Sequence, residues 1–150
     1  MIPLLRLRIP RTKISASLLP NRKQLRAFLQ QFWQDYDGQP AEVEYNFVDR
    51  ATIARLHRDF LDDPSETDII TFDLGLAPDN RQVAAVTICP EVASLHAARY
   101  NVSLQEEIKR LMLHGLLHLL GFNDKNARER RRMRYHERKL LRKLSHYTSC

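Results

Sequence analysis

Glycine and cysteine are scarce in this chain of 150 residues, which contains four glycines and two cysteines. A collagen-like protein needs glycine at every third position, so that class is excluded. The two cysteines, Cys89 and Cys150, cannot form the disulfide framework of a small secreted protein, and a reducing cytosol suits them better. Hydrophobic residues make up 43% and charged residues 28% of the chain. This composition also excludes a wholly disordered protein.

Long hydrophobic runs are absent as well. The longest unbroken apolar run is the four residues 83–86, whereas a helix that crosses a bilayer needs about 18 or more. The first residues alternate apolar side chains with Arg6 and Arg8 and lack the apolar segment of a secretory signal. We therefore expect a cytoplasmic protein with no membrane partner. Its length predicts a single domain, residues 1–150, because domains contain about 100–200 residues.

Acidic residues are absent from the first 26 residues, which contain seven Lys and Arg. Residues 27–124 carry a net charge of −9, and residues 125–150 carry ten Lys and Arg against two acids. Clustered Lys and Arg bind phosphates and release counterions, so the two basic ends favour a nucleic-acid partner. A solvated helix face gives the same pattern. An anionic membrane surface fits less well, because few large apolar residues lie between the basic ones.

The hydrophobic pattern predicts strands alternating with helices early in the chain and mainly helices later. Period-two alternation and β-rich runs indicate strands over 5–9, 43–47, 68–74 and 82–89. Helical spacing indicates helices over 21–36, 53–60, 90–100, 103–120 and 126–144. The helix at 103–120 is apolar nearly all round, so we expect it at the centre. The predicted fold class is α/β (α+β), a small, mostly parallel or mixed β-sheet of about four strands with helices packed on it.

The segment from His114 to Asp124 contains the residues with the clearest chemistry. His114 and His118 are four residues apart, so they lie on one face of the central helix. Gly121 can adopt a positive φ and turn the chain back, which can return Asp124 to the same point. Two imidazoles and a carboxylate are good Zn²⁺ ligands, and three protein ligands leave one position open, as in catalytic sites. We expect one Zn²⁺ per chain on His114, His118 and Asp124. Alternatively, both histidines are core residues bonded to carbonyl groups.

The same spacing occurs in the zincin-like His-x-x-x-His helix of metallopeptidases. Their long motif, His-Glu-x-x-His-x-x-Gly-x-x-His/Asp, contains a glutamate that acts as the general base. This chain has Gly115 at that position, and glycine cannot accept a proton. A zinc metallopeptidase is therefore a less favoured function, and no catalytic side chain is assigned.

Residues 114–124 closely resemble the signature of the YbeY family of bacterial ribosomal-RNA maturation factors, His-Gly-x-Leu-His-Leu-x-Gly-Tyr-Asp-His. Phe122 stands here for the tyrosine, Asn123 for the aspartate and Asp124 for the last histidine. A second match, Thr-Asp-Ile-Ile-Thr-Phe at 67–72, is similar to the family's Thr-Asp-Val-Leu-Ser-Phe strand. The resemblance covers about residues 40–140.

Three departures from the family pattern change what the resemblance implies. Asp124 makes the third ligand a carboxylate, whose negative charge should make the metal a weaker Lewis acid. The family's arginine after the helix containing Leu56 falls at Leu61. If that arginine contacts phosphate, this chain must supply the positive charge elsewhere. Where the family usually has Gly-Asp in the region of the third strand, this chain has Ala84-Ala85.

The resemblance implies a metal-dependent, single-strand-specific endoribonuclease that acts in 16S rRNA 3′-end maturation and ribosome quality control. Its partners would be single-stranded RNA, the 16S rRNA precursor and the ribosome, with no DNA. Further candidates near the cleft, which spacing alone does not place, are His57, His96, Arg99, Lys125 and Arg128. The alternative is a ribosome-associated RNA-binding factor with a structural metal and with the basic ends as its functional surface.

Overall fold

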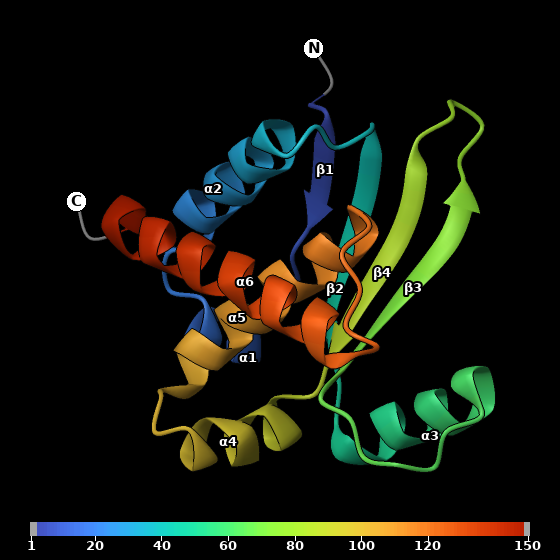
Figure 1. The fold of residues 1–150 in the computed structure, drawn as a ribbon, viewed down its shortest axis with the longest axis vertical. Helices are drawn as coiled ribbons and strands as arrows, with labels where there is room; N and C mark the ends of the chain where they lie inside the picture. Colours follow the sequence, from blue (N-terminus) through green and yellow to red (C-terminus); the bar gives the residue numbers. More distant parts are fainter. Residues whose placement is uncertain (1–2, 149–150) are drawn as a thin grey trace.

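The computed structural model describes residues 3–148, in which one four-stranded sheet is combined with six helices (Figure 1). The elements in chain order are β1 (Leu5–Arg8), α1 (Lys13–Leu18), α2 (Arg22–Asp35), β2 (Ala41–Phe47), α3 (Arg50–Leu61), β3 (Ile69–Leu76), β4 (Gln82–Ile88), α4 (Pro90–Arg99), α5 (Leu104–Leu119) and α6 (Ala127–Thr148).

The sheet is mixed, with strand order β1-β2-β4-β3. Strands β1, β2 and β4 are parallel, and β3 pairs antiparallel with β4 at the edge of the sheet. The predicted α/β class with about four strands is therefore confirmed. The edge position of β3 leaves one side of this strand free of a neighbouring strand within the described part of the chain. Residues of β3 also line the cleft described below.

Alternation along the strands separates a buried face from a polar one. Leu5 and Leu7 of β1 are buried, whereas Arg6 lies on the other face, 3.6 Å from the carboxylate of Glu42 on β2. Figure 1 shows α2, α5 and α6 gathered on one side of the sheet. The helix α5 contacts β3, β4, α4 and α6, which confirms its predicted central position.

The structure also differs from the sequence-based expectations. The helix α1 was not expected; Thr12 caps it, because its side chain accepts from the Ser15 amide while Ser15 Oγ accepts from the Thr12 amide. Strand β3 extends to Leu76, beyond the predicted end at 74. Cys89 is buried and free, and Cys150 lies outside the described residues. Among residues 3–148, the helices lack the combination of length and hydropathy that crossing a membrane requires.

Candidate metal centre

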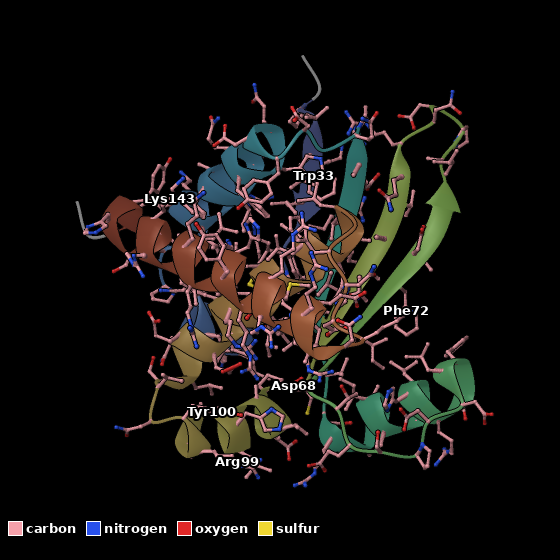
Figure 2. All side chains as sticks on the ribbon, in the orientation of Figure 1. Trp33, Asp68, Phe72, Arg99, Tyr100 and Lys143 are labelled. Carbon is pink, nitrogen blue, oxygen red and sulfur yellow. The ribbon has the colours of Figure 1, made fainter. Side chains whose placement is uncertain are left out.

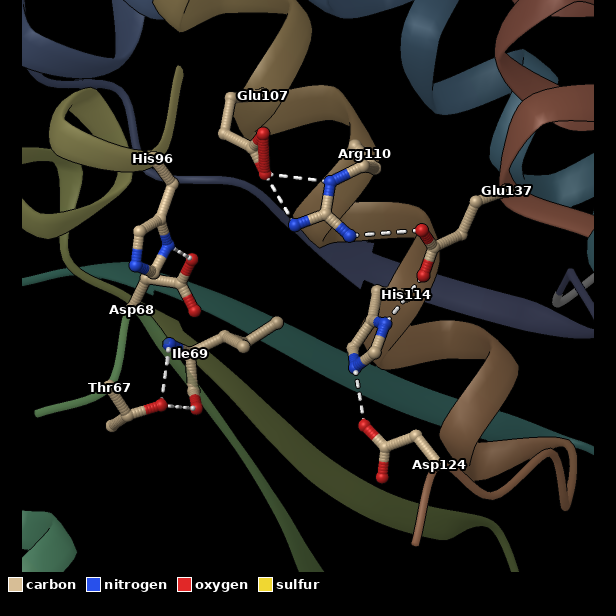
Figure 3. A network of polar contacts seen from close by, with 9 residues as sticks. All are labelled: Thr67, Asp68, Ile69, His96, Glu107, Arg110, His114, Asp124 and Glu137. Atoms are coloured by element: carbon tan, nitrogen blue, oxygen red, sulfur yellow. Dashed lines mark hydrogen bonds and ion pairs between the residues drawn. The ribbon is translucent and has the colours of Figure 1, made fainter. Parts of the chain in front are cut away.

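A cleft of about 560 Å³ opens between the edge strand β3 and the central helix α5. Its β3 side is lined by residues from Thr67 to Asp73, and Leu61 at the end of α3 lies at its margin. On the opposite side, α5 contributes His114 and His118, and the following loop contributes Asp124. The cleft therefore contains all three predicted metal ligands (Figure 3 shows His114 and Asp124).

Local sequence explains how these three side chains meet. The four-residue spacing on α5 places the imidazole rings of His114 and His118 with centroids 4.6 Å apart. The helix ends in a Schellman motif, because the Gly121 amide donates to the His118 carbonyl and the Phe122 amide donates to the Leu117 carbonyl. Gly121 adopts a φ of +105°, as the predicted chain reversal requires. The reversed chain carries Asp124 back to the histidines.

The donor atoms have the spacing that a single cation needs. Asp124 Oδ2 lies 3.5 Å from His114 Nε2 and 3.4 Å from His118 Nε2. Two atoms that each bind Zn²⁺ at about 2.0–2.1 Å with a tetrahedral angle are themselves about 3.4 Å apart. One ligand atom from each of the three residues lies within 4.8 Å of the others. The group His114, His118 and Asp124 could therefore hold a metal ion with little rearrangement.

A carboxylate of α6 orients the imidazole ring of His114. Its Nδ1 atom lies 2.6 Å from Glu137 Oε2, and Glu137 is only 3% exposed. A carboxylate can only accept, so Nδ1 of His114 donates, and in the neutral imidazole Nε2 presents its lone pair to the cleft. Carboxylates that hold a histidine in this way fix the ring and make it a better metal ligand.

Glu137 is in turn held by Arg110, one helical turn before His114 on α5. The Arg110 Nη1 atom donates to Glu137 Oε1 at 2.9 Å, and its Nε atom donates to Glu107 Oε1 at 2.7 Å (Figure 3). Burial by itself would raise the pKa of Glu137, but the hydrogen bond from His114 and the charge of Arg110 outweigh it, so this pKa is lowered. Burial likewise opposes the charge of Arg110, yet Glu107 and Glu137 together raise its pKa.

Gly115 lies on the part of α5 that packs against the sheet, beside Val86 of β4 and Thr71 of β3. A Cβ atom at this position would meet Val86 Cγ1 at 2.8 Å and Val86 Cγ2 at 2.9 Å, closer than carbon atoms pack. The glutamate that metallopeptidases carry here therefore has no room, and the glycine is explained by the close approach of α5 to β4.

The other residues singled out in the sequence fall in different places. His96 bonds to Asp68 at 2.8 Å and, with Arg99, lines a second groove beside the cleft. His57 is buried in the α3 region, with Nδ1 2.8 Å from the Ser65 carbonyl oxygen. Lys125 and Arg128 are exposed and belong to the lining of neither the cleft nor this groove. Leu61, the residue expected at the position of the family's arginine, is 53% exposed and lines the cleft.

Sequence reasoning missed Glu137, Arg110 and Glu107, although a signal was present. Glu137 falls between Met133 and Leu140 at helical spacing, on the face of α6 that is otherwise buried. A charged residue in an apolar stripe is seldom buried without a partner. The partner itself lies on another helix, so the spacing within α6 could not name it.

Comparisons with known proteins identify the family. A family model described as Endoribonuclease YbeY matches residues 11–145. The chain is 37% identical to the endoribonuclease YbeY of Beutenbergia cavernae over 67% of this chain and 73% of that protein. It is 32% identical to the one of Azobacteroides pseudotrichonymphae over 83% of this chain and 88% of that protein. A solution structure of a Thermotoga maritima protein, 25% identical, superposes with a TM-score of 0.61 and covers 93% of this chain and 88% of that one. With its sheet, its histidine helix and its sequence in agreement, this chain belongs to the YbeY family of endoribonucleases.

Proposed function

We propose that this chain is a metal-dependent, single-strand-specific endoribonuclease that acts in 16S rRNA 3′-end maturation and ribosome quality control. It would work in the cytoplasm, as a single domain of residues 1–150, with the rRNA precursor and the ribosome as partners. One Zn²⁺ would be held by His114, His118 and Asp124. Membership of the family supports RNA as the substrate.

The observation that carries the metal assignment is the geometry of the three donor atoms. Oδ2 of Asp124 is 3.5 Å from one histidine nitrogen and 3.4 Å from the other, and Glu137 orients His114. Imidazole nitrogen and carboxylate oxygen are the ligand types of catalytic zinc sites with three protein ligands. When bound, the cation supplies Lewis acidity toward a phosphodiester oxygen and activates water.

The residues of the chain itself shape and orient the site. Glu137 holds the Nδ1 proton of His114, so the ring keeps one tautomer and one direction. The cleft of about 560 Å³ has room for a nucleotide splayed out of a stack. An unpaired strand presents such a nucleotide freely, whereas a duplex must first unpair it. This difference supports a preference for single-stranded RNA.

Metal analysis and RNA cleavage test this proposal together. We expect about one Zn²⁺ per purified chain, a ratio typical of a catalytic site with three protein ligands. We expect almost none in His114→Ala/His118→Ala. The matched control is His146→Ala, an exposed histidine of α6. Cleavage of single-stranded RNA should stop with a chelator and in His118→Ala. Unchanged cleavage in His118→Ala would refute the assignment.

Two other functions predict different results in the same assays. A ribosome-associated RNA-binding factor with a structural metal would bind RNA without cutting it, and chelation would loosen the fold. A zinc metallopeptidase would cut a denatured protein and leave RNA intact. The packing of Gly115 against Val86 argues against the peptidase, because it leaves no room for that enzyme's general base.

A further inference from the structure

The cleft by itself is poorly suited to hold the phosphates of an RNA strand. Three carboxylates line it, those of Asp68, Asp73 and Asp124. The lining includes one cationic side chain, Arg110, whose guanidinium is already engaged by Glu107 and Glu137. Leu61, which also lines the cleft, adds no charge. A metal ion would balance part of this negative charge, but the phosphates beyond the reacting one need cations elsewhere.

These cations lie in a second groove of about 410 Å³ that adjoins the cleft. Asp68 and Arg110 line both hollows, so the two lie side by side. The second groove runs between the end of α4, the start of α5 and α6. Figure 2 shows Arg99 and Tyr100 at α4, and Asp68 between α4 and the sheet.

The exposed charges of this groove are mainly positive. Arg99, Arg134 and Arg138 are exposed, and Glu106 is the exposed acid among the described residues that line the groove. The remaining carboxylates are occupied: Glu107 and Glu137 bind Arg110, and Asp68 bonds to His96. The arginines are therefore free to attract phosphates, whereas most of the acids are not free to repel them.

The same groove also exposes an aromatic ring. Tyr100, which caps α4 at its C-terminus, is 66% exposed, and Val102 beside it is 44% exposed. Arginines beside an exposed aromatic side chain are typical of sites for single-stranded nucleic acid, because any base can stack on the ring while its phosphate binds the guanidinium. Packing in the core does not explain a tyrosine at this position, because its ring is mostly exposed, and a helix C-cap does not require a tyrosine.

The outer surface of α6 continues the positive charge beyond the groove. Arg134 and Arg138 also line a hollow with Arg131, Lys139 and Arg142, around the exposed ring of Tyr135. The spacing of three and four residues places these side chains in one stripe along the helix. The basic C-terminal zone of the sequence is thus organised as a surface that begins at the groove.

We propose that the groove between α4 and α6 is an extended RNA subsite. In this subsite Tyr100 stacks a base, and Arg134 and Arg138 bind phosphates of the same strand. The scissile bond of that strand lies at His114, His118 and Asp124. This subsite rests on the proposed nuclease function, and it supplies the positive charge that Leu61 does not. Its occupant is the substrate strand itself, on one side of the cleavage point.

Affinity as a function of RNA length tests the subsite. The probes are fluorescein-labelled oligouridylates of about four and about twelve nucleotides, since sites for single strands span about 4–16 nucleotides. Binding is measured by fluorescence anisotropy in the full-length His118→Ala chain, in which the proposed function predicts no cleavage. The longer probe should bind more tightly than the shorter one, because only the longer probe reaches the groove.

Substitutions in the groove should abolish the tighter binding of the longer probe. In Tyr100→Ala we expect about 5-fold or greater weakening for the longer probe, the effect of losing one stacked base, while Tyr100→Phe should bind as the parent does. Arg134→Ala/Arg138→Ala should weaken binding of the longer probe about 10-fold. It should also make the slope of log affinity against log salt concentration shallower by about 1.4, because two phosphate contacts are lost. The shorter probe should be little affected by either change.

The matched control is Arg130→Ala/Lys143→Ala, which removes the same charge from exposed positions of α6 that line neither hollow. Thermal unfolding of each variant verifies that the exposed substitutions leave the fold intact. The subsite would be overturned if the control pair weakened binding equally. It would also be overturned if Tyr100→Ala and Arg134→Ala/Arg138→Ala bound RNA as the parent does. In either case, chelator-sensitive cleavage by the parent would still support the nuclease function. A parent chain that neither binds nor cuts RNA would overturn both.

Discussion

Nδ1 of His114 on α5 and Oε2 of Glu137 on α6 lie 2.6 Å apart, although 23 residues separate them in the sequence. This contact couples the last helix to the candidate metal centre. It explains why α6 carries a carboxylate on its buried face, whereas the outer face of the same helix is basic.

Replacing Glu137 by Gln should weaken metal binding. The amide keeps the size of the side chain but loses the negative charge that orients His114 and pairs with Arg110. Loss of such a carboxylate typically lowers metal affinity about 10–100-fold. Competition with a chromogenic zinc chelator measures the change. Glu106→Gln, an exposed change on α5, should retain the parental affinity, and equal affinities in all three chains would contradict the orienting role.

Gly115→Ala should destabilise the chain despite the better helix propensity of alanine. The added methyl group meets both Cγ atoms of Val86 within 3 Å. Overpacking of this kind costs about 1–3 kcal/mol, against a gain of about 1 kcal/mol from helix propensity. Urea unfolding measures the free energy. In the double variant with Val86→Ala the two costs should be less than additive by at least about 0.5 kcal/mol, and strict additivity would show that the contact is relieved in another way.

Asp124→His should increase activity and shift its pH dependence. A neutral imidazole leaves more positive charge on the cation than a carboxylate does, so the metal becomes a stronger Lewis acid. We expect kcat/KM for RNA to rise and the ascending limb of its pH profile to move to lower pH. Asp124→Ala, with one ligand fewer, is the control and should lose metal. A profile that stays in place would show that the charge of Asp124 does not limit the Lewis acidity.

Tyr45→Phe should change how stability depends on alkaline pH. The Tyr45 hydroxyl is buried and donates to the Met112 carbonyl at 2.9 Å, so its removal should cost about 1 kcal/mol near neutral pH. Burial raises the pKa of Tyr45 well above its ordinary value of 10.0. Above about pH 10 the unfolded chain therefore loses this proton while the folded chain keeps it, and the free energy of unfolding falls as pH rises.

The measurement is urea unfolding of both chains between neutral pH and about pH 11, a range that includes the ordinary tyrosine pKa of about 10. The difference between parent and Tyr45→Phe should be constant below that pKa. Above it, the difference should narrow by up to about 1.4 kcal/mol for each pH unit. A difference that stays constant throughout would mean that the Tyr45 phenol ionises equally easily in the folded chain.

The sequence predicted most of the secondary structure because periodicity is a local property. Strands β1, β2 and β4 and helix α5 lie within a few residues of their predicted bounds. The helix α1 was missed, since six residues without a clear apolar stripe give too weak a signal. The proximity of the three candidate ligands was predictable for the same local reason: His114 and His118 share one helix, and Gly121 turns the chain within the next few residues.

By itself, then, the sequence determined which segments form helices and strands, and which three side chains could meet around a cation. Only the tertiary structure decided which residue orients His114, why position 115 is glycine, and where the arginines of α6 stand relative to the cleft. These depend on how α5 packs between β4 and α6. That packing joins residues far apart in the chain, and the spacing within one element contains no information about the side chains it meets on another.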